Sequence, residues 1–336
     1  MFPAGIPDLL SSGRNARLIA EVQANFQRAS DELTSGRKSD VVAATGGDPA
    51  RLFGVERELT AVAQRRINVD IAISRASIIQ SSLERVQTAL ERVGVPLLAA
   101  VERDDVGAAL TEAETARSAF EEAVSALNSR FGDRTLFSGA ATDGPALATG
   151  PDLLQQIFAA TSAATDAASV IAAVDAYFSS PTGFAATGYL GSTTNASASE
   201  IDDGQREDFA LRADNADLVS GLRALALAAV ASEGAFAGAN IGAQLDILRV
   251  AGESGIAATD RVINLRGLLG VSEERLDVAK TRLSGENAFL QQARNAIISK
   301  DQFEAANEFT ALEGQLSLVF EVTARLSTLK LQNFLR

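Results

Sequence analysis

The chain has 336 residues, 46% of them hydrophobic, and a net charge of −13 at pH 7, so it is long enough to bury one large core or several small ones. It contains neither histidine nor cysteine, which excludes Ser-His-Asp and Cys-His nucleophiles, the usual zinc sites and disulfides. The acidic excess would repel a phosphate backbone and an anionic membrane, so we expect no nucleic-acid partner and no membrane insertion.

An amphipathic first helix is predicted by apolar residues that alternate at spacings of three and four. Gly36 follows the stripe and is suited to cap the helix at its carboxyl end. A polar segment, residues 37–49, is expected to be a loop. The residues of this first stripe are Ile19, Val22, Phe26, Ala29 and Leu33.

Two further helices are expected before residue 132. The second starts near Leu52 and keeps a heptad pattern up to Val93, after which Gly94 and Pro96 should end it. The third runs over about 105–131, with apolar residues on one side. The first half of the chain is therefore expected to be mainly helical.

The middle of the chain has a different composition. Residues 151–178 are rich in alanine and predicted to be helical, whereas 179–206 are rich in Gly, Ser, Thr and Asn. Short strands are expected at Gly188–Leu190 and Asp208–Leu211, and a helix at Ala216–Ala231. This region is interpreted as a small α+β domain inserted between two helical halves.

The carboxyl end resembles the amino end in its pattern. Hydrophobic residues recur every seventh position from Val262 to Ile297, and Asp301 with Glu304 three residues later forms a capping-box pattern. No basic region precedes the run, which argues against a leucine-zipper transcription factor. The stripe of the last helix consists of Phe309, Leu312, Leu316, Val319 and Leu326.

The stripes at the two ends need partners. An isolated amphipathic helix is marginally stable in water, so the end helices can pair with each other, with other subunits, or with both. We expect them to be assembly surfaces. The alternative is that each stripe is the core face of an ordinary helical bundle.

No motif for catalysis, cofactor binding or metal binding is found, and the chain is not expected to be an enzyme. Thr45–Pro49 resembles part of a phosphate-binding loop but lacks the following Lys-Ser/Thr. Asp202-Asp203-Gly204 has too few spaced oxygens for a calcium loop. Adjacent acidic pairs such as Glu121-Glu122 diverge around a helix and are expected to be solvated.

Three segments resemble the flagellin family and, within it, the branch of hook-associated protein 3, the hook–filament junction protein. They are Leu33–Lys38 with Gly47–Ala50, then Leu127-Asn128 with Asp133–Pro145, and the closing helix up to Leu335. The Leu-Phe-Ser-Gly run is the most specific of these. The matching motif residues are Ser35, Gly36, Asp48, Pro49, Asn128, Arg134, Leu136, Phe137, Ser138 and Gly139.

The resemblance implies a role that the residue patterns alone do not give. It implies a structural subunit that joins hook and filament as a ring of identical copies, with the first hook-associated junction protein and flagellin as neighbours. It also implies an extracellular location in the flagellum, export without a cleaved signal peptide through the type III channel, and a chaperone at the carboxyl terminus. No cofactor is implied.

The expected fold is mainly α, with long terminal helices paired into a coiled-coil-like rod and a small α+β central insertion. The expected domains are 1–50 (terminal helix and loop, pairing with the last helix), 51–147 (amino-terminal half of the helical rod, with a β-turn region), 148–250 (central outward-facing accessory domain), 251–300 (carboxyl-terminal half of the rod) and 301–336 (terminal assembly helix). Two alternative functions stay open: a soluble, chemoreceptor-like signalling coiled coil, and flagellin itself.

Overall fold

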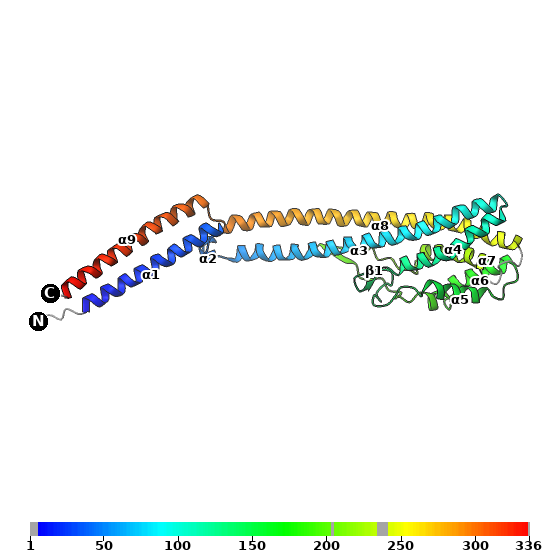
Figure 1. Ribbon diagram of the computed structural model, residues 1–336, viewed down its shortest axis with the longest axis horizontal. Helices are drawn as coiled ribbons and strands as arrows, with labels where there is room; N and C mark the ends of the chain where they lie inside the picture. The colour runs from blue at the N-terminus through cyan, green and yellow to red at the C-terminus, as the bar shows by residue number, and fades with distance from the viewer. Residues whose placement is uncertain (1–5, 203–204, 234–240, 335–336) are drawn as a thin grey trace. The chain divides into compact units, whose positions relative to one another are not determined.

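A computed structural model describes residues 6–202, 205–233 and 241–334 of the chain, and most of them are helical (Figure 1). The chain divides into two compact units, one formed by Met1–Ala63 with Gly285–Arg336 and the other by Gln64–Ser284. The two ends of the chain therefore belong to one unit. Long helices pack against each other, and only two small antiparallel sheets occur in the described ranges, which confirms the predicted fold class.

The elements follow one another along the chain in a simple order. The first half contains α1 (Ile6–Ser35), α2 (Val41–Ala44), α3 (Ala50–Glu102), α4 (Val106–Leu127), β1 (Arg130–Phe131) and β2 (Arg134–Thr135). The second half contains α5 (Gly150–Thr161), α6 (Ala167–Ser179), the π-helical turn η1 (Phe184–Gly188), β3 (Ser199–Asp202), β4 (Gln205–Glu207), α7 (Ala216–Glu233), α8 (Ile241–Ile298) and α9 (Gln302–Phe334).

Within Gln64–Ser284, α3 and α8 pack antiparallel. Their register is marked by two ion pairs, Lys280 with Asp70 at 2.9 Å and Arg266 with Glu84 at 3.6 Å. The predicted heptad residues of α8 in this unit lie in the core, each at most 7% exposed: Val262, Leu269, Leu276 and Leu283. A seven-residue repeat keeps one apolar seam facing the partner helix over many turns.

The prediction that the second helix ends at Gly94 and Pro96 is wrong, because α3 continues to Glu102. Proline inside a helix removes one hydrogen bond and costs about 3 kcal/mol. Burial of apolar side chains beyond it offsets this cost, since three residues there are at most 2% exposed: Leu97, Ala100 and Val101. Gly94 permits close packing, because a Cβ there would lie 3.4 Å from the backbone of Gly255 on α8.

The third helix is shorter than predicted. The Asp105 side chain caps α4 by accepting a hydrogen bond of 3.0 Å from the Ala108 amide. The helix ends at Leu127 instead of Phe131, because the chain turns there and Phe131 pairs with Arg134 in the hairpin of β1 and β2. The apolar spacing alone could not show this turn.

Helices α4 and α7 pack closely through small side chains. Six alanines of α4 are fully buried: Ala109, Ala113, Ala116, Ala119, Ala123 and Ala126. Six consecutive residues of α7, Ala226 to Ala231, are also fully buried. Small side chains let helix axes approach closely, so this part of the core needs few aromatic rings. The low aromatic content of the sequence therefore reflects how its helices pack.

The central segment departs from the prediction in detail. Residues 151–178 fall in two helices, α5 and α6, since Asp166 caps a new helix by accepting a 2.7 Å hydrogen bond from the Ser169 amide. The strands predicted at 188–190 and 208–211 are absent from the described structure, apart from a single bridge between Tyr189 and Leu147. The hairpin lies instead at β3 and β4, where Ser199 pairs with Glu207.

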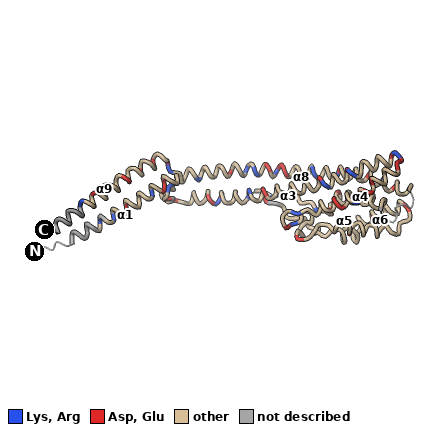
Figure 2. The backbone as a smooth tube through the Cα atoms, viewed as in Figure 1, with Lys and Arg blue, Asp and Glu red and all other residues tan. Residues whose placement is uncertain are grey.

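Charge and hydropathy vary in short intervals along the helices. Acidic and basic residues alternate along α3 and α8 and do not form long blocks (Figure 2).

In the part of the chain that the structure describes, no helix combines the length and hydropathy that a bilayer-spanning segment requires.

Candidate assembly surfaces

The two terminal helices, α1 and α9, lie side by side and antiparallel (Figure 1). They are not consecutive in the chain, and the pair is called the terminal hairpin below. Their predicted stripes face each other, and the rings of Phe26 and Phe309 lie 4.9 Å apart at 34°. A tilted pair at this distance is a favourable aromatic geometry. The pairing within the chain is one of the arrangements that the sequence left open.

Most stripe residues of this hairpin are only half-buried. Ala29 is buried, while Ile19, Val22, Phe26 and Leu33 on α1 keep part of their surface exposed. The α9 residues that share this half-buried state are Phe309, Leu312, Leu316 and Val319. The side chain of Leu326 lies outside the described residues. Two helices alone thus cover their stripes incompletely.

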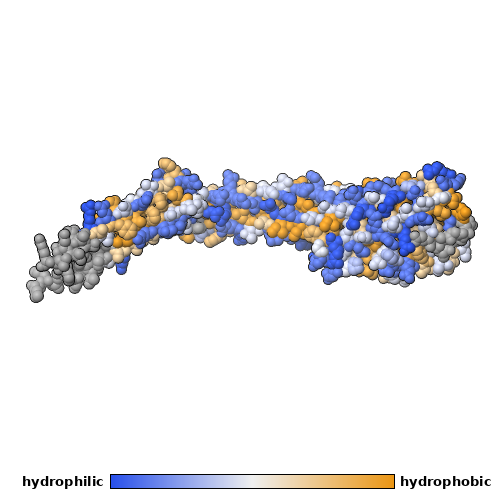
Figure 3. Space-filling view, viewed as in Figure 1, coloured by the Kyte–Doolittle hydropathy of each residue, from blue (hydrophilic) through white to orange (hydrophobic). Residues whose placement is uncertain are grey.

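A second set of apolar residues on the same two helices lies outside the predicted stripes. Leu318 is 62% exposed, Val322 55%, Phe320 50% and Leu18 55%. Leu318 follows Leu316 by two residues, and such residues point about 200° apart around a helix, so it faces away from the paired stripe. Figure 3 shows hydrophobic residues at the surface of this unit. The pair Leu318 and Val322, spaced by four, is the sequence signal that could have shown this face.

The segments that follow α1 and precede α9 are joined by backbone hydrogen bonds. The Lys38 amide donates to the Ile298 carbonyl at 2.8 Å, and the Lys300 amide donates to the Gly36 carbonyl at 3.1 Å. Gly36 has φ +65°, the left-handed conformation that glycine adopts readily, and this confirms its predicted role as helix cap. Ser35 donates its hydroxyl hydrogen to the Asp31 carbonyl at 2.6 Å.

A nearly buried cluster of charged side chains lies at the same place, where the segment after α1 meets the segment before α9. This place is called the crossing below. The Lys300 side chain is 13% exposed and lies 2.9 Å from the Glu308 carboxylate, 3.6 Å from Glu304 and 3.7 Å from Glu32. The hydrogen bond to Glu308 raises the pKa of Lys300, with further contributions from the charges of Glu308, Glu304 and Glu32. Glu32 also accepts a 2.8 Å hydrogen bond from the Ser39 amide. No sequence pattern pointed to this cluster.

The predicted N-cap of the last helix is confirmed. Asp301 Oδ1 accepts hydrogen bonds from the amides of Phe303 at 2.9 Å and Glu304 at 3.0 Å. The motif residue Asp48 acts in a similar way before α3, where its Oδ1 accepts from the Ala50 amide at 2.9 Å. The carbonyl of Pro49 accepts from the Phe53 amide in the first turn of that helix.

Residues of the motif segment after α4 hydrogen-bond to the loop that follows β2. Asn128 makes a two-way contact with Leu147: its Nδ2 donates to the carbonyl at 3.0 Å, and its Oδ1 accepts from the amide at 2.9 Å. Arg134 Nε donates to Thr142 Oγ1 at 3.0 Å, and Thr135 Oγ1 donates to the Gly144 carbonyl at 2.6 Å. These bonds close the loop between β2 and α5.

The Leu-Phe-Ser-Gly run is buried and hydrogen-bonds to two parts of the central segment. Leu136 is 8% exposed, Phe137 and Ser138 are fully buried, and the Phe137 carbonyl accepts from the Ala213 amide at 2.9 Å. The Ser138 carbonyl accepts from the Ser192 amide at 2.8 Å. Gly139 has φ +63°, and a Cβ on it would lie 2.5 Å from the Ser192 carbonyl oxygen. No larger residue fits there without moving backbone.

The described ranges contain no group of three or more acidic side chains that could hold a metal ion. Their polar side chains mainly cap helices, close loops and pair helices.

Comparison with known proteins places the fold. No protein-family model and no curated protein matches the sequence. Among solved structures, a protein of Vibrio parahaemolyticus described as a flagellar hook-associated protein is similar, with a TM-score of 0.50 and 19% identity over 74% of this chain and 96% of that chain. FlgL of Bacillus cereus is similar with a TM-score of 0.52 and 16% identity over 72% of this chain and 100% of that chain.

Both similar structures are covered almost completely, so the likeness extends through their whole length and is not confined to one helical hairpin. The family resemblance of the motif residues and the likeness of the folds are independent observations that agree. The chain therefore has the fold of the flagellar hook-associated proteins.

Proposed function

We propose that the chain is a structural subunit of the bacterial flagellum that joins hook and filament and assembles with copies of itself through its terminal helices. The observation that carries the proposal is the hairpin of α1 and α9, which pairs both chain ends and still exposes a second apolar face with Leu318 and Val322. The fold shared with flagellar hook-associated proteins supports the same role.

Assembly would complete the burial that the hairpin begins. Each half-buried or exposed leucine, valine or phenylalanine gains up to about 1.5–3 kcal/mol when it is fully removed from water. A pair of helices that covers its stripes incompletely is only marginally stable, so contact with neighbouring subunits should order the chain ends as it forms. Subunit addition and ordering of the ends are then one coupled step.

The neighbours follow from the proposed position. A ring of identical subunits would contact the first hook-associated junction protein on one side and flagellin on the other, through unlike surfaces above and below. Export would occur through the flagellar type III channel without a cleaved signal peptide, and a chaperone would bind near the carboxyl terminus. The absence of cysteine is compatible with export as an unfolded chain, because no disulfide can form before secretion.

The experiment replaces the gene in its own bacterium with a variant. Leu318→Asp puts a carboxylate on the exposed apolar face, and burying an unpaired charge there costs several kcal/mol. We expect the isolated variant to keep the wild-type melting temperature, because the side chain is exposed, while filaments detach and flagellin is released into the medium. Ser317→Asp adds the same charge one residue away, at another exposed position of α9, and should leave filaments intact. Normal filaments in the Leu318→Asp strain would contradict the proposal.

A further inference from the structure

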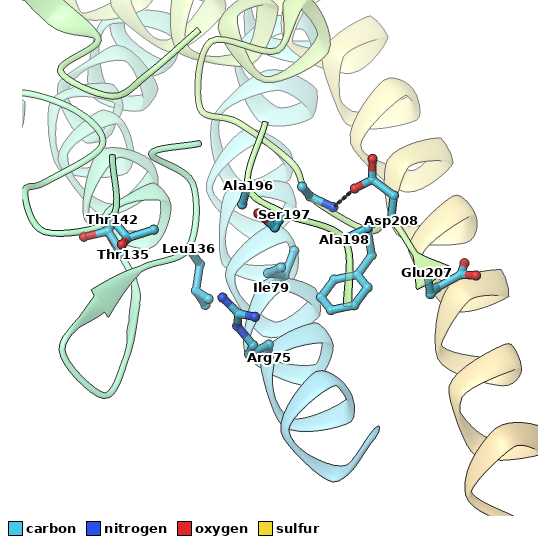
Figure 4. A pocket seen from close by; sticks show the side chains of 12 residues that line it. Arg75, Ile79, Thr135, Leu136, Thr142, Ala196, Ser197, Ala198, Glu207 and Asp208 are labelled. Atoms are coloured by element: carbon cyan, nitrogen blue, oxygen red, sulfur yellow. Dashed lines mark hydrogen bonds between the residues drawn. The ribbon is translucent and has the colours of Figure 1, made fainter. Parts of the chain in front are cut away.

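A small pocket beside α3 contains a cation that has no partner in the described chain. Its wall includes Arg75 and Ile79 of α3, Thr135 and Leu136 of the motif loop, and residues 196–198 and 207–210 (Figure 4). Arg75 makes no hydrogen bond or ion pair with any residue that the structure describes. The pocket volume is about 30 Å³, which suits one water molecule or one carboxylate group.

The surroundings of Arg75 favour an anion. Burial, together with the nearby positive charge of Arg134, lowers the pKa of Arg75. The acidic residues of the wall have partners of their own: Glu207 accepts from Ser272 Oγ at 2.8 Å and from Arg275 at 3.1 Å, and Asp208 accepts from the Ala210 amide at 3.0 Å. In Figure 4 the Glu207 side chain lies toward α8, away from Arg75. A carboxylate entering the pocket would relieve the repulsion between the two guanidinium groups.

Complementary charge is present on α8 of the same unit. Glu273 and Asp277 lie one helical turn apart, and neither forms an ion pair with a described residue. Partial burial and the negative charge of Asp277 raise the pKa of Glu273, although Arg266 opposes this shift. The two carboxylates repel each other and would be stabilised by an external cation.

The two charged sites lie at one level of the helix pair but on opposite sides. The register set by Lys280 with Asp70 and by Arg266 with Glu84 places Arg75 beside Arg275. Arg275 points to the segment that lines the Arg75 pocket, since it binds Glu207. Glu273 and Asp277 are each two residues from Arg275 and so lie about 160–200° around α8 from it.

We propose that the Arg75 pocket receives the Asp277 carboxylate of a second copy of this chain, with Glu273 beside its rim, as a side-by-side contact within the assembly. This inference rests on the proposed function and adds the lateral surface to the terminal one. A contact between two unlike surfaces at one level repeats in one direction, and this is the arrangement that generates a ring or a helix of subunits. In a molecule with an excess of 13 negative charges, a contact that places a cation against an acidic site of the neighbouring copy reduces the repulsion between copies.

Cross-linking tests the contact directly, because the natural chain contains no cysteine. Arg75→Cys and Asp277→Cys are combined in one chain, and isolated flagella are treated with a short bis-maleimide reagent. We expect a ladder of dimers and larger species from the double variant and none from either single variant. Filaments on the cells without a ladder would overturn the lateral contact and leave the proposed function standing. A ladder from a single variant would also overturn it, because like surfaces would then meet.

Charge reversal provides an independent measurement in the same strains. Arg75→Glu alone and Asp277→Arg alone should each reduce the fraction of cells with filaments about tenfold, and the combination should restore it. Arg85→Glu is the matched control, since Arg85 is an exposed arginine of the same helix that does not line the pocket and donates to Ser129 Oγ at 2.7 Å. Failure of the combination to restore filaments, with all variants folded by thermal melting, contradicts the contact. Normal filaments in a strain that lacks the chain contradict the proposed function instead.

Discussion

At the scale of single residues, Phe137 and Gly139 show how a short motif can stabilise a fold without forming an interface. The Phe137 ring is fully buried, and the carbonyls of Phe137 and Ser138 hold two segments of the central region. Both residues lie inside the molecule, so the motif is available for packing and not for a partner. The large residue, Phe137, fills a space in the core, and the small residue, Gly139, lets the backbone of Ser192 approach closely.

Replacing Phe137 measures this anchor. Phe137→Ala should lower the free energy of unfolding by about 3–5 kcal/mol, because it removes a buried ring and leaves a cavity. Phe53→Ala is the control, since Phe53 is 60% exposed, and it should change the stability by less than about 0.5 kcal/mol. Urea denaturation followed by circular dichroism gives both values. Equal effects of the two substitutions would mean that Phe137 is not an anchor.

Tyr189 gives a prediction in pH. Burial, and after it the charge of Asp214, raises the pKa of the Tyr189 phenol from 10.0 to about 12, while Arg212 opposes the shift. The phenol ionises near pH 10 in the unfolded chain but stays protonated to a higher pH in the folded chain. The contribution of Tyr189 to stability is therefore complete below pH 10 and is lost as the pH rises through 12.

The test compares urea denaturation of the natural chain and of Tyr189→Phe between pH 9 and pH 12. The hydrogen bond of 2.8 Å from the phenol to the Ser192 carbonyl is lost in the variant, so we expect about 1 kcal/mol lower stability at pH 9. We also expect a flatter decline between pH 10 and pH 12. An identical slope for both proteins would show that Tyr189 does not titrate in this way.

Local rules predicted some residues well and others not at all. Asp301 and Gly36 could be predicted because a cap depends on its own sequence neighbours. The cluster of Lys300 with Glu32 could not, since its members come from opposite ends of the chain. Arg75 was invisible for the same reason: only the fold shows that a residue lacks a partner.

At the scale of elements, the long helices were predictable because their apolar residues repeat every seven positions over many turns. The errors lie where two effects compete. Pro96 predicts a helix end, yet the burial of apolar side chains in the following turn outweighs the cost of the proline, and α3 continues. The strands at 188–190 and 208–211 were expected from composition alone, whereas β3 and β4 form where the chain can turn back on itself.

The crossing between the terminal helices and the adjoining segments gives a prediction at this scale. Lys300→Gln leaves Glu32, which is 8% exposed, with no cation and should destabilise the pairing of α1 and α9 by about 1–3 kcal/mol. Amide hydrogen exchange in these two helices should accelerate accordingly, while exchange in α4 and α7 stays unchanged.

Lys280→Gln serves as the control for this substitution. Its ion pair with Asp70 is half exposed on both sides, and such surface pairs contribute about 0–1 kcal/mol. Faster exchange in α1 and α9 from the control, or none from Lys300→Gln, would show that the crossing does not depend on the buried cluster.

At the scale of the whole molecule, the exposed surfaces are suited to contacts between subunits. The chain ends pair and keep apolar surface exposed, and most described polar groups serve packing and capping. The proposed role is that of a subunit of the hook–filament junction, and the alternatives are a chemoreceptor-like signalling coil and flagellin itself. The three alternatives differ in where the protein lies on the cell.

The position of the protein on the cell is therefore the most direct test. Ala160→Cys introduces the only thiol of the chain at an exposed position of α5, and maleimide-gold then labels intact cells for electron microscopy, with the unmodified strain as control. The proposed function predicts label confined to one narrow band between hook and filament. Label along the whole filament would identify a flagellin, and absence of label from the flagellum would contradict the account.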